Sequence, residues 1–312
     1  MKATIAIDIG ASRMRAASFS ISNNERLVYN QIATRSEGIP IEDRLVNLIE
    51  SVWPEDAEVC SLAAACPGPM DPINGIVVSP PNIPEWRYFP LQEFLHNTFS
   101  IPVAINNDAN LAAYGEWHFG AGQGSKDLIY LTISTGIGSG IILNNKLFIG
   151  PRGFGSEIGH TTINHEGPEC ACGQKGHLEA IASGPSIVRW VKSQLADESL
   201  REHFPEGELT AKHISDAAED GNQLAVAAYE RAGKYIGIAI ADLLHIFNVS
   251  LIIIGGGVSK AGDLLFDPIR KSVKEHVMSD IYLDDLQILP AALGDDCGLM
   301  GALVLSKEIS DQ

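Results

Sequence analysis

The sequence of 312 residues is poor in basic side chains: 22 lysines and arginines stand against 39 aspartates and glutamates, for a net charge of −17. A chain with such an excess of negative charge repels phosphate backbones and anionic lipid surfaces. We therefore expect no nucleic-acid partner and no membrane partner.

The chain also lacks a long apolar run. Its most apolar interior stretch, Phe247–Val258, is interrupted by Asn248 and by three glycines, whereas a helix that spans a bilayer needs about 20 predominantly apolar residues. The N-terminal sequence MKATIAIDIG shows no charged leader, apolar core or cleavage site of a secretory signal. We expect a cytoplasmic protein.

Cysteine is scarce as well, because the chain has only five and they follow no regular spacing. This excludes a disulfide framework, and in a reducing compartment thiols serve as core residues, metal ligands or nucleophiles. The composition, with 45% hydrophobic and 20% charged residues, is ordinary for a soluble globular protein. The length is sufficient for two domains with separate cores.

Strand and helix patterns alternate along the chain. Runs of β-branched and apolar residues predict strands, and apolar residues three and four positions apart predict helices. Alternation on this scale is typical of α/β layers. The predicted strands include 4–9, 13–20, 27–33, 59–65 and 103–106, and the predicted helices include 41–52, 109–117, 185–195, 211–218 and 223–247.

Two segments share the pattern of strand, small-residue turn and strand. They are IAIDIGASRMRAASF, which begins at Ile5, and IYLTISTGIGSGIIL, which begins at Ile129. Two such hairpins suggest duplicated domains that face one another, with the turns directed into a cleft; a chance resemblance between two glycine-containing hairpins is the alternative. No linker rich in proline, glycine or serine divides the halves, so we predict a hinge near Gly115–Ser125.

Three glycine turns, at Gly10, Gly136 and Gly255, each follow an apolar strand. Backbone amides of a glycine turn can approach phosphate closely because no side chain blocks them. The chain has no GxxxxGK[ST] loop, and GIGSG leads into another strand rather than a helix, which argues against a dinucleotide fingerprint. Each turn alone is better explained as a simple β-turn, but the three together favour nucleotide binding.

The dipeptide Asn107-Asp108 ends a predicted strand and opens a predicted helix. Aspartate is a good N-cap, so capping is one explanation of Asp108. The other is a functional carboxylate at a strand tip, where α/β proteins place their ligands and where it could accept a proton. Both interpretations remain open on the sequence.

Residues 160–177, a segment that we call the metal loop, contain two cysteines and three histidines, and the cysteines together with the first and last histidine form the candidate site. Two thiolates and two imidazoles suit tetrahedral zinc, and four protein ligands leave no open position for a catalytic water. The predicted site is therefore structural and would pin the segments that carry Glu157 and Glu179. Two core thiols and two unrelated histidines are the alternative. The candidate ligands are His160, Cys170, Cys172 and His177.

With these motifs, the sequence resembles the ROK family (repressors, open reading frames, sugar kinases) from Ile5 to about Leu303. The matching pieces are DIGAS, PGPMD with PNIPEW, NNDAN, STGIGSG, GSEIGH, CACGQKGHLEA, IIGGGV and LGDDCGLMGA. The resemblance implies an α/β, actin-like (ribonuclease H-like) fold of two duplicated domains with a cleft between them. The implied domains are 1–116, completed by a C-terminal helix at 298–312, and 117–297.

The resemblance also implies ATP- and Mg²⁺-dependent phosphorylation of a hexose, with a structural Zn²⁺ and with glucose as the expected substrate. N-acetylmannosamine, N-acetylglucosamine and fructose are alternative substrates, polyphosphate is an alternative donor, and homodimers are common in the family. A sugar-sensing repressor would carry an N-terminal helix-turn-helix, which we do not expect because the first strand begins at Ile5. An actin-like ATPase chaperone or filament would lack NNDAN and the metal loop.

The family's functional residues can be carried over to matching positions. Asp108 would be the general base, and Asp8 would lie near Mg²⁺. The implied sugar contacts are Asn82, Asn107, Asp108, Glu157, His160 and Glu179. The implied nucleotide contacts are Asp8, Gly10, Ser12, Thr135, Gly136, Gly138, Gly255, Gly256 and Gly257.

The chain departs from the family pattern at two positions. His177 replaces the last cysteine of CxCGxxGC, which exchanges a thiolate for an imidazole, although zinc accepts both donors. Ala11 replaces the second glycine of GGT while Ser12 keeps the hydroxyl. Because alanine is restricted at positive φ, we expect that the approach of this backbone to phosphate could differ.

Overall fold

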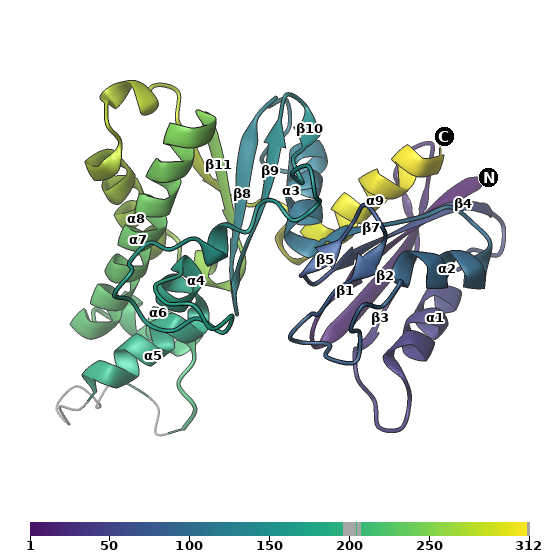
Figure 1. Ribbon diagram of the computed structural model, residues 1–312, viewed down its shortest axis with the longest axis horizontal. Coiled ribbons are helices and arrows are strands. Elements are labelled where there is room, and N and C mark those ends of the chain that lie inside the picture. Colours follow the sequence, from purple (N-terminus) through teal and green to yellow (C-terminus); the bar gives the residue numbers. More distant parts are fainter. Residues whose placement is uncertain (196–203, 205–206, 311–312) are drawn as a thin grey trace. The chain divides into compact units, whose positions relative to one another are not determined.

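The computed structural model describes residues 1–195, 204 and 207–310, and these form a mixed α/β protein (Figure 1). The chain divides into two compact units. The first comprises Met1–Lys126, Gly140–Ser156 and the residues from Ala292 onward, and the second comprises Asp127–Ser139 and Glu157–Ala291. Residues 311 and 312, at which the predicted C-terminal helix ends, lie outside the described part.

The first unit contains a five-stranded sheet in the order β3-β2-β1-β4-β7. β1, β2 and β3 are antiparallel neighbours, whereas β4 runs parallel to both β1 and β7. The carboxyl ends of β1, β4 and β7 therefore meet at one edge of the sheet. The strands are β1 (Lys2–Ile9), β2 (Arg13–Ser20), β3 (Arg26–Ala33), β4 (Glu58–Cys66) and β7 (Val103–Asn107), and a separate small pair is β5 (Met70–Asp71) with β6 (Ile76–Val77).

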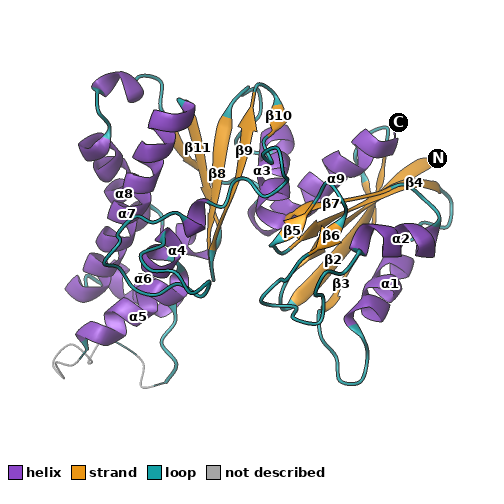
Figure 2. Ribbon diagram, in the orientation of Figure 1, coloured by secondary structure: helices purple, strands orange, loops and turns teal. Residues whose placement is uncertain are grey.

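Helices cover both faces of this sheet (Figure 2). Alternate β1 residues such as Ile5 and Ile7 share one apolar core with α1 (Ile41–Ser51) and α2 (Leu91–Phe99). On the other face Ser61 donates a hydrogen bond to the Ser306 carbonyl of α9. The helices of this unit are α1, α2, α3 (Asp108–Phe119) and α9 (Cys297–Ser310), with the short turn η5 (Gly294–Asp296) before α9.

Glycines allow α3 and α9 to approach closely. A Cβ at Gly115 would lie 2.4 Å from the Cys297 carbonyl oxygen, and one at Gly301 would lie 1.7 Å from the carbonyl oxygen of Leu111. Only glycine fits at such distances. This contact fixes α3, and with it Asp108 at its start, against the core of the first unit.

The second sheet has the order β10-β9-β8-β11-β12, which repeats the strand order of the first sheet. In each sheet, three successive strands lie side by side. Two further strands then extend the sheet on the free side of the first of these three. The hairpins that begin at Ile5 and Ile129 therefore occupy the same place in their sheets, as a duplication predicts. The strands are β8 (Leu128–Ile133), β9 (Ile137–Leu143), β10 (Lys146–Leu147), β11 (Leu251–Gly255) and β12 (Gln287–Pro290).

The long helix α7 packs against α8 in the second unit, where a Cβ at Gly237 would lie 2.5 Å from the Ser272 side chain. All the strands and helices predicted above are present. None of the helices in the described part of the chain is long and apolar enough to cross a bilayer. The helical elements of this unit are η1 (Ile158–His160), α4 (Leu178–Ala182), α5 (Gly184–Gln194), α6 (Ala211–Glu219), α7 (Gln223–Phe247), η3 (Gly257–Ala261), α8 (Asp263–His276) and η4 (Asp280–Tyr282).

Candidate active site and metal centre

Two candidate carboxylates lie at the carboxyl edge of the first sheet. Asp8 is the penultimate residue of β1, and Asp108 directly follows β7. Cys66 ends β4 between them. Burial raises the pKa of the Cys66 thiol well above its ordinary value, and the negative charges of Asp108 and Asp8 raise it further. Both carboxylates therefore lie near the same buried thiol, which stays protonated at neutral pH.

Asp108 is not the N-cap of α3, because the N-cap is Asn107. The Asn107 Oδ1 accepts hydrogen bonds from the backbone N–H groups of Ala109 at 2.9 Å and Asn110 at 3.2 Å. Asp108 is the first residue of the helix, it is exposed, and its Oδ1 accepts the Ala109 N–H at 2.8 Å. This contradicts the capping interpretation of Asp108, and its role as a proton acceptor stays a prediction.

The sequence did not single out the cation that accompanies Asp8. The Arg15 guanidinium contacts the Asp8 carboxylate and lies 3.8 Å from Asp296, which also pairs with Arg26 at 2.7 Å. Burial raises the pKa of Asp8 above its ordinary value, the contact with Arg15 opposes that rise, and the charge of Asp296 adds to it. The predicted hairpin of β1 and β2 carried a signal for Arg15, because the antiparallel register of this hairpin places Arg15 directly opposite Asp8.

The first glycine turn has an ordinary backbone. The Gly10 N–H donates to the Arg13 carbonyl at 2.9 Å, and a Cβ at Gly10 would lie 2.8 Å from that oxygen. Ala11 does not have a positive φ. Alanine in place of the usual glycine is therefore compatible with this turn. Ser12 is exposed, and its carbonyl accepts the Thr34 N–H at 3.0 Å.

Asn82, the remaining candidate of the first unit, is exposed on the loop after β6. Its carbonyl accepts a hydrogen bond from the Arg35 guanidinium at 2.8 Å, and Arg35 also pairs with Glu85 at 3.1 Å. These contacts fix the backbone at Asn82 and leave its side chain on the surface.

The second glycine turn is held by a carboxylate. Within the turn, the Ser134 N–H donates to the Gly136 carbonyl at 2.8 Å. The Ile137 N–H donates to Glu179 Oε2 at 2.9 Å. A Cβ at Gly136 would lie 2.5 Å from that same oxygen. Only glycine lets Glu179 come so close, and Gly138 lies on β9 beyond the contact.

A cavity of about 690 Å³ opens beside this turn, wholly within the second unit. Thr135 and Gly257 belong to its lining, and Val188, Leu209 and Val258 make apolar parts of its wall. The glycines after β11 differ in their roles. Gly256 has φ 87° and packs against the strand β8, whereas a Cβ at Gly257 would meet nothing within 4 Å. Sequence reasoning found the turn residues but missed Val188 and Leu209, which no motif marks.

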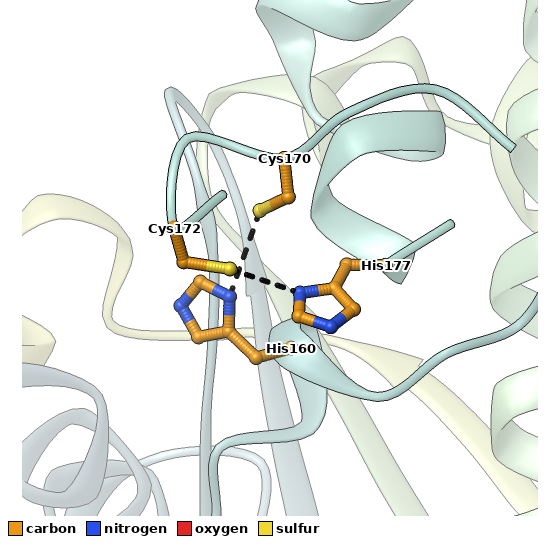
Figure 3. A group of neighbouring side chains, drawn as sticks. All are labelled: His160, Cys170, Cys172 and His177. Atoms are coloured by element: carbon orange, nitrogen blue, oxygen red, sulfur yellow. Dashed lines mark hydrogen bonds between the residues drawn. The ribbon is translucent and has the colours of Figure 1, made fainter. Parts of the chain in front are cut away.

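The structure brings the four predicted metal ligands together (Figure 3). One ligand atom from each lies within 4.8 Å of all the others. Cys172 Sγ lies 3.3 Å from His177 Nδ1, and Cys170 Sγ lies 3.7 Å from His160 Nδ1. Two sulfur and two nitrogen donors at this spacing fit a tetrahedral zinc ion. His160 belongs to η1, and His177 precedes the first residue of α4.

Tight turns shape the metal loop. The Cys170 N–H donates to the Gln174 carbonyl at 2.7 Å, and the Gly173 N–H donates to the Cys170 carbonyl at 2.9 Å. Gly176 has φ 73°, and a Cβ there would lie 1.6 Å from the Asn164 carbonyl oxygen. The glycines of CGQKGH therefore meet a backbone requirement, which is what allows both thiols to face the histidines.

Two carboxylates flank the metal loop. The residue Glu157 as a whole is exposed, but neighbouring atoms desolvate its carboxylate, and this raises its pKa. The charge of His160 lowers the pKa of Glu157, and the charge of Glu179 raises it. Glu179 is half-buried, and its Oε1 lies 3.7 Å from Cys170 Sγ. Glu179 thus contacts both the metal loop and the second glycine turn, a double role that the sequence did not predict.

Comparisons with known proteins extend over nearly the whole chain. Residues 4–309 match the family model described as the ROK family. A glucokinase of Streptomyces coelicolor is 34% identical over 316 aligned residues, covering 99% of this chain and 98% of that protein. A xylose repressor of Caldicellulosiruptor bescii is 33% identical over 259 residues, covering 81% of this chain and 64% of that protein. The crystal structure of a ROK family glucokinase from Streptomyces griseus, in complex with glucose and AMPPNP, has a TM-score of 0.84 at 35% identity and covers 98% of this chain and 99% of its own.

Proposed function

The chain belongs to the ROK family, and from this premise we propose that it is an ATP-dependent sugar kinase that converts glucose to glucose 6-phosphate. Similarity to the S. coelicolor glucokinase over nearly all of both chains supports the activity. The S. griseus structure, which holds glucose and an ATP analogue, supports the two substrates. The proposal includes an actin-like fold, which the repeated strand order of the two sheets supports.

The observation that carries the proposal is the pair of carboxylates at one edge of the first sheet. Asp108 is exposed at the start of α3 while Asn107 does the capping. A carboxylate that is not needed as a cap can accept the proton of a sugar hydroxyl. Asp8 is buried and ion-paired nearby, as suits a group that stays in place beside a charged substrate.

The proposed reaction is a direct phosphoryl transfer. The sugar oxygen attacks the γ-phosphorus of ATP, its proton passes to Asp108, and the bond from that phosphorus to the bridging oxygen breaks to release ADP. Mg²⁺ supplies neutralisation of phosphate charge when it accompanies the nucleotide. Asp8 would hold the position next to that ion, and the turn that contains Gly10 and Ser12 would approach the phosphate oxygens.

The cavity of the second unit supports a nucleotide as the donor. Its apolar side chains, Val188, Leu209 and Val258, suit a purine ring, whereas a polyphosphate has no apolar part to bury. Thr135 and Gly257, at the same cavity, would place the phosphates toward the glycine turn. The proposed nucleotide contacts of this unit are Thr135, Gly136, Gly138, Gly255, Gly256 and Gly257.

The sugar contacts of the proposal come from polar side chains of each unit. Carboxylates and amides suit a hexose because they accept and donate hydrogen bonds to neighbouring hydroxyls. In the first unit these side chains belong to Asn82, Asn107 and Asp108, and in the second unit to Glu157, His160 and Glu179.

The metal loop is proposed to hold a structural zinc ion. The ligand atoms are close enough, and two sulfur and two nitrogen donors match the preference of zinc. Four protein ligands would close the coordination sphere. Zinc would supply rigidity to the loop and take no part in phosphoryl transfer.

A coupled assay of ADP formation, run with ATP and a panel of glucose, N-acetylmannosamine, N-acetylglucosamine and fructose, tests the proposal. We expect the highest kcat/KM with glucose and no turnover when polyphosphate replaces ATP. Another sugar as the preferred substrate would keep the kinase and change its specificity. Sugar binding without phosphorylation of any member would overturn the kinase and favour a sugar-sensing regulator.

A further inference from the structure

The second glycine turn is enclosed by the two segments that flank the metal loop. On one side, a Cβ at Gly159 of η1 would lie 2.0 Å from the Ile137 carbonyl oxygen, so η1 packs directly on the backbone of the turn. On the other side, the N–H of Gly184, which begins α5 directly after α4, donates to the Ser134 carbonyl at 2.9 Å. The backbone of the turn is therefore contacted by η1 and by the junction of α4 with α5.

The candidate metal ligands join these same two segments. His160 is the last residue of η1, and His177 immediately precedes α4. Besides the metal ligands, backbone contacts link the segments, among them a hydrogen bond of 3.0 Å from the Leu178 N–H to the Thr161 carbonyl and a β-bridge between Thr162 and His177. A metal ion bound to both histidines would fix the separation of their side chains in addition, because metal–ligand bonds to imidazole hold about 2.0–2.1 Å.

Glu179 carries the contact from α4 to the turn. It lies two residues after His177, and its Oε2 accepts the Ile137 N–H at 2.9 Å. A hydrogen bond to a charged acceptor is stronger than one between neutral groups. Movement of α4 would therefore be transmitted to Ile137 and to the adjoining residues Ser134 and Thr135, which line the cavity.

We propose that Glu179 is a positioning residue through which occupancy of the metal loop controls the affinity of the second glycine turn for the donor nucleotide. The proposal rests on the proposed function, because it takes the cavity beside the turn as the nucleotide site. It differs from a purely structural zinc, since metal and nucleotide become linked ligands. Linkage requires that each increase the affinity for the other by the same factor.

Calorimetric titration of the protein with Mg²⁺ and AMPPNP, without sugar, measures the linkage. We expect zinc-loaded wild-type protein to bind the nucleotide about tenfold more tightly than protein stripped by a chelator, within the range typical of coupled sites. In Glu179→Ala, nucleotide binding should be weaker, and zinc should change it by a smaller factor than in the wild type. Glu179→Gln keeps an oxygen that can accept the Ile137 N–H, so it should retain most of the linkage.

The affinity for zinc can be measured by competition with a chromophoric chelator, with and without AMPPNP. The ratio of the two zinc affinities should equal the ratio of the nucleotide affinities. This measurement does not require metal-free protein to be handled alone. Glu169→Gln is the matched control. Glu169 is an exposed carboxylate of the metal loop, and its backbone pairs with Lys175 of the same loop and not with the turn. Equal nucleotide affinity with and without zinc, or an unchanged linkage in Glu179→Ala, would overturn the inference. Absence of nucleotide binding to zinc-loaded wild type would instead contradict the proposed function.

Discussion

The two glycine turns hold the same place in sheets of the same strand order but are supported by different means. Beside the first turn lies a set of ion pairs in which Arg15 contacts Asp8 and Asp296. The second turn is held by backbone contacts from η1 and from Gly184 at the start of α5, and by the carboxylate of Glu179. The same arrangement of strands and turn therefore has ion pairs beside it in one sheet and the metal loop beside it in the other.

This difference indicates a division of labour. The first unit concentrates carboxylates and a guanidinium at the edge of the sheet where Asp108 lies, which suits the proposed proton and phosphoryl transfer. The second unit offers an apolar cavity and a turn whose backbone is contacted from both sides. We therefore expect substitutions in the first unit to lower kcat or stability, and substitutions in the second to weaken binding.

The largest effect is expected for Asp108→Asn. Removal of the proton acceptor should lower kcat by ~10²–10⁴-fold, while the helix keeps its cap because Asn107 provides it. Sugar affinity by calorimetry should change by less than about tenfold, roughly 1.4 kcal/mol, and the melting temperature should hold. A variant that keeps more than about a tenth of wild-type kcat would show that Asp108 is not the general base. The expected difference between substitutions in the first and in the second unit would then fail.

The charged support of the first turn is tested by Arg15→Gln. The Asp8 and Arg15 side chains are only 13% and 21% exposed. Loss of the cation leaves a buried carboxylate without a partner, and this should reduce the free energy of unfolding by about 3 kcal/mol, as measured in urea.

The matched control is Arg26→Gln, whose partner Asp296 is 41% exposed. A surface pair of this kind should contribute less than about 1 kcal/mol. Asp8→Asn in the Arg15→Gln background should recover part of the loss, because it removes the orphan charge. Equal losses for the Arg15 and Arg26 variants would show that the first turn does not depend on its buried ion pair.

On the side of the second unit, Glu157→Gln should weaken glucose binding by about 1–3 kcal/mol, the scale of a hydrogen bond to a charged group. Calorimetry gives the dissociation constant, and kcat at saturating sugar should stay within a few fold. Glu166→Gln, an exposed residue of the metal loop, serves as the control. An unchanged dissociation constant for every sugar of the panel would argue against a binding role.

The smallest effect is expected for His177→Cys. A thiolate is also a zinc ligand, so elemental analysis should still find one zinc per chain. The variant sharpens the comparison because it restores the family's usual cysteine without touching the first unit. Wild-type protein that contains no zinc when purified without chelator would remove the metal loop as the support of the second turn.

The sequence predicted the strands and helices because their signals are local. Periodicity of apolar side chains located β1 and α7 within a residue or two, and glycines marked the turns at Gly10 and Gly136. The domain limits at 116 and 117 stay a prediction, and so do the roles of the individual site residues. The sequence placed Asp108 correctly at the start of the helix. It could not decide between Asp108 and Asn107 as the N-cap, because aspartate and asparagine cap about equally well and the choice depends on the backbone angles of each residue.

By itself, the sequence determined the four candidate metal ligands and the position of each glycine turn directly after an apolar strand. These residues lie close together along the chain. Only the tertiary structure decided that Arg15 meets Asp296, that Glu179 reaches Ile137, and that Val188 and Leu209 line a cavity. The reason is physical. Contacts between distant segments depend on how sheets and helices pack, and an apolar side chain that lines a ligand cavity has the same local pattern as one that fills a core.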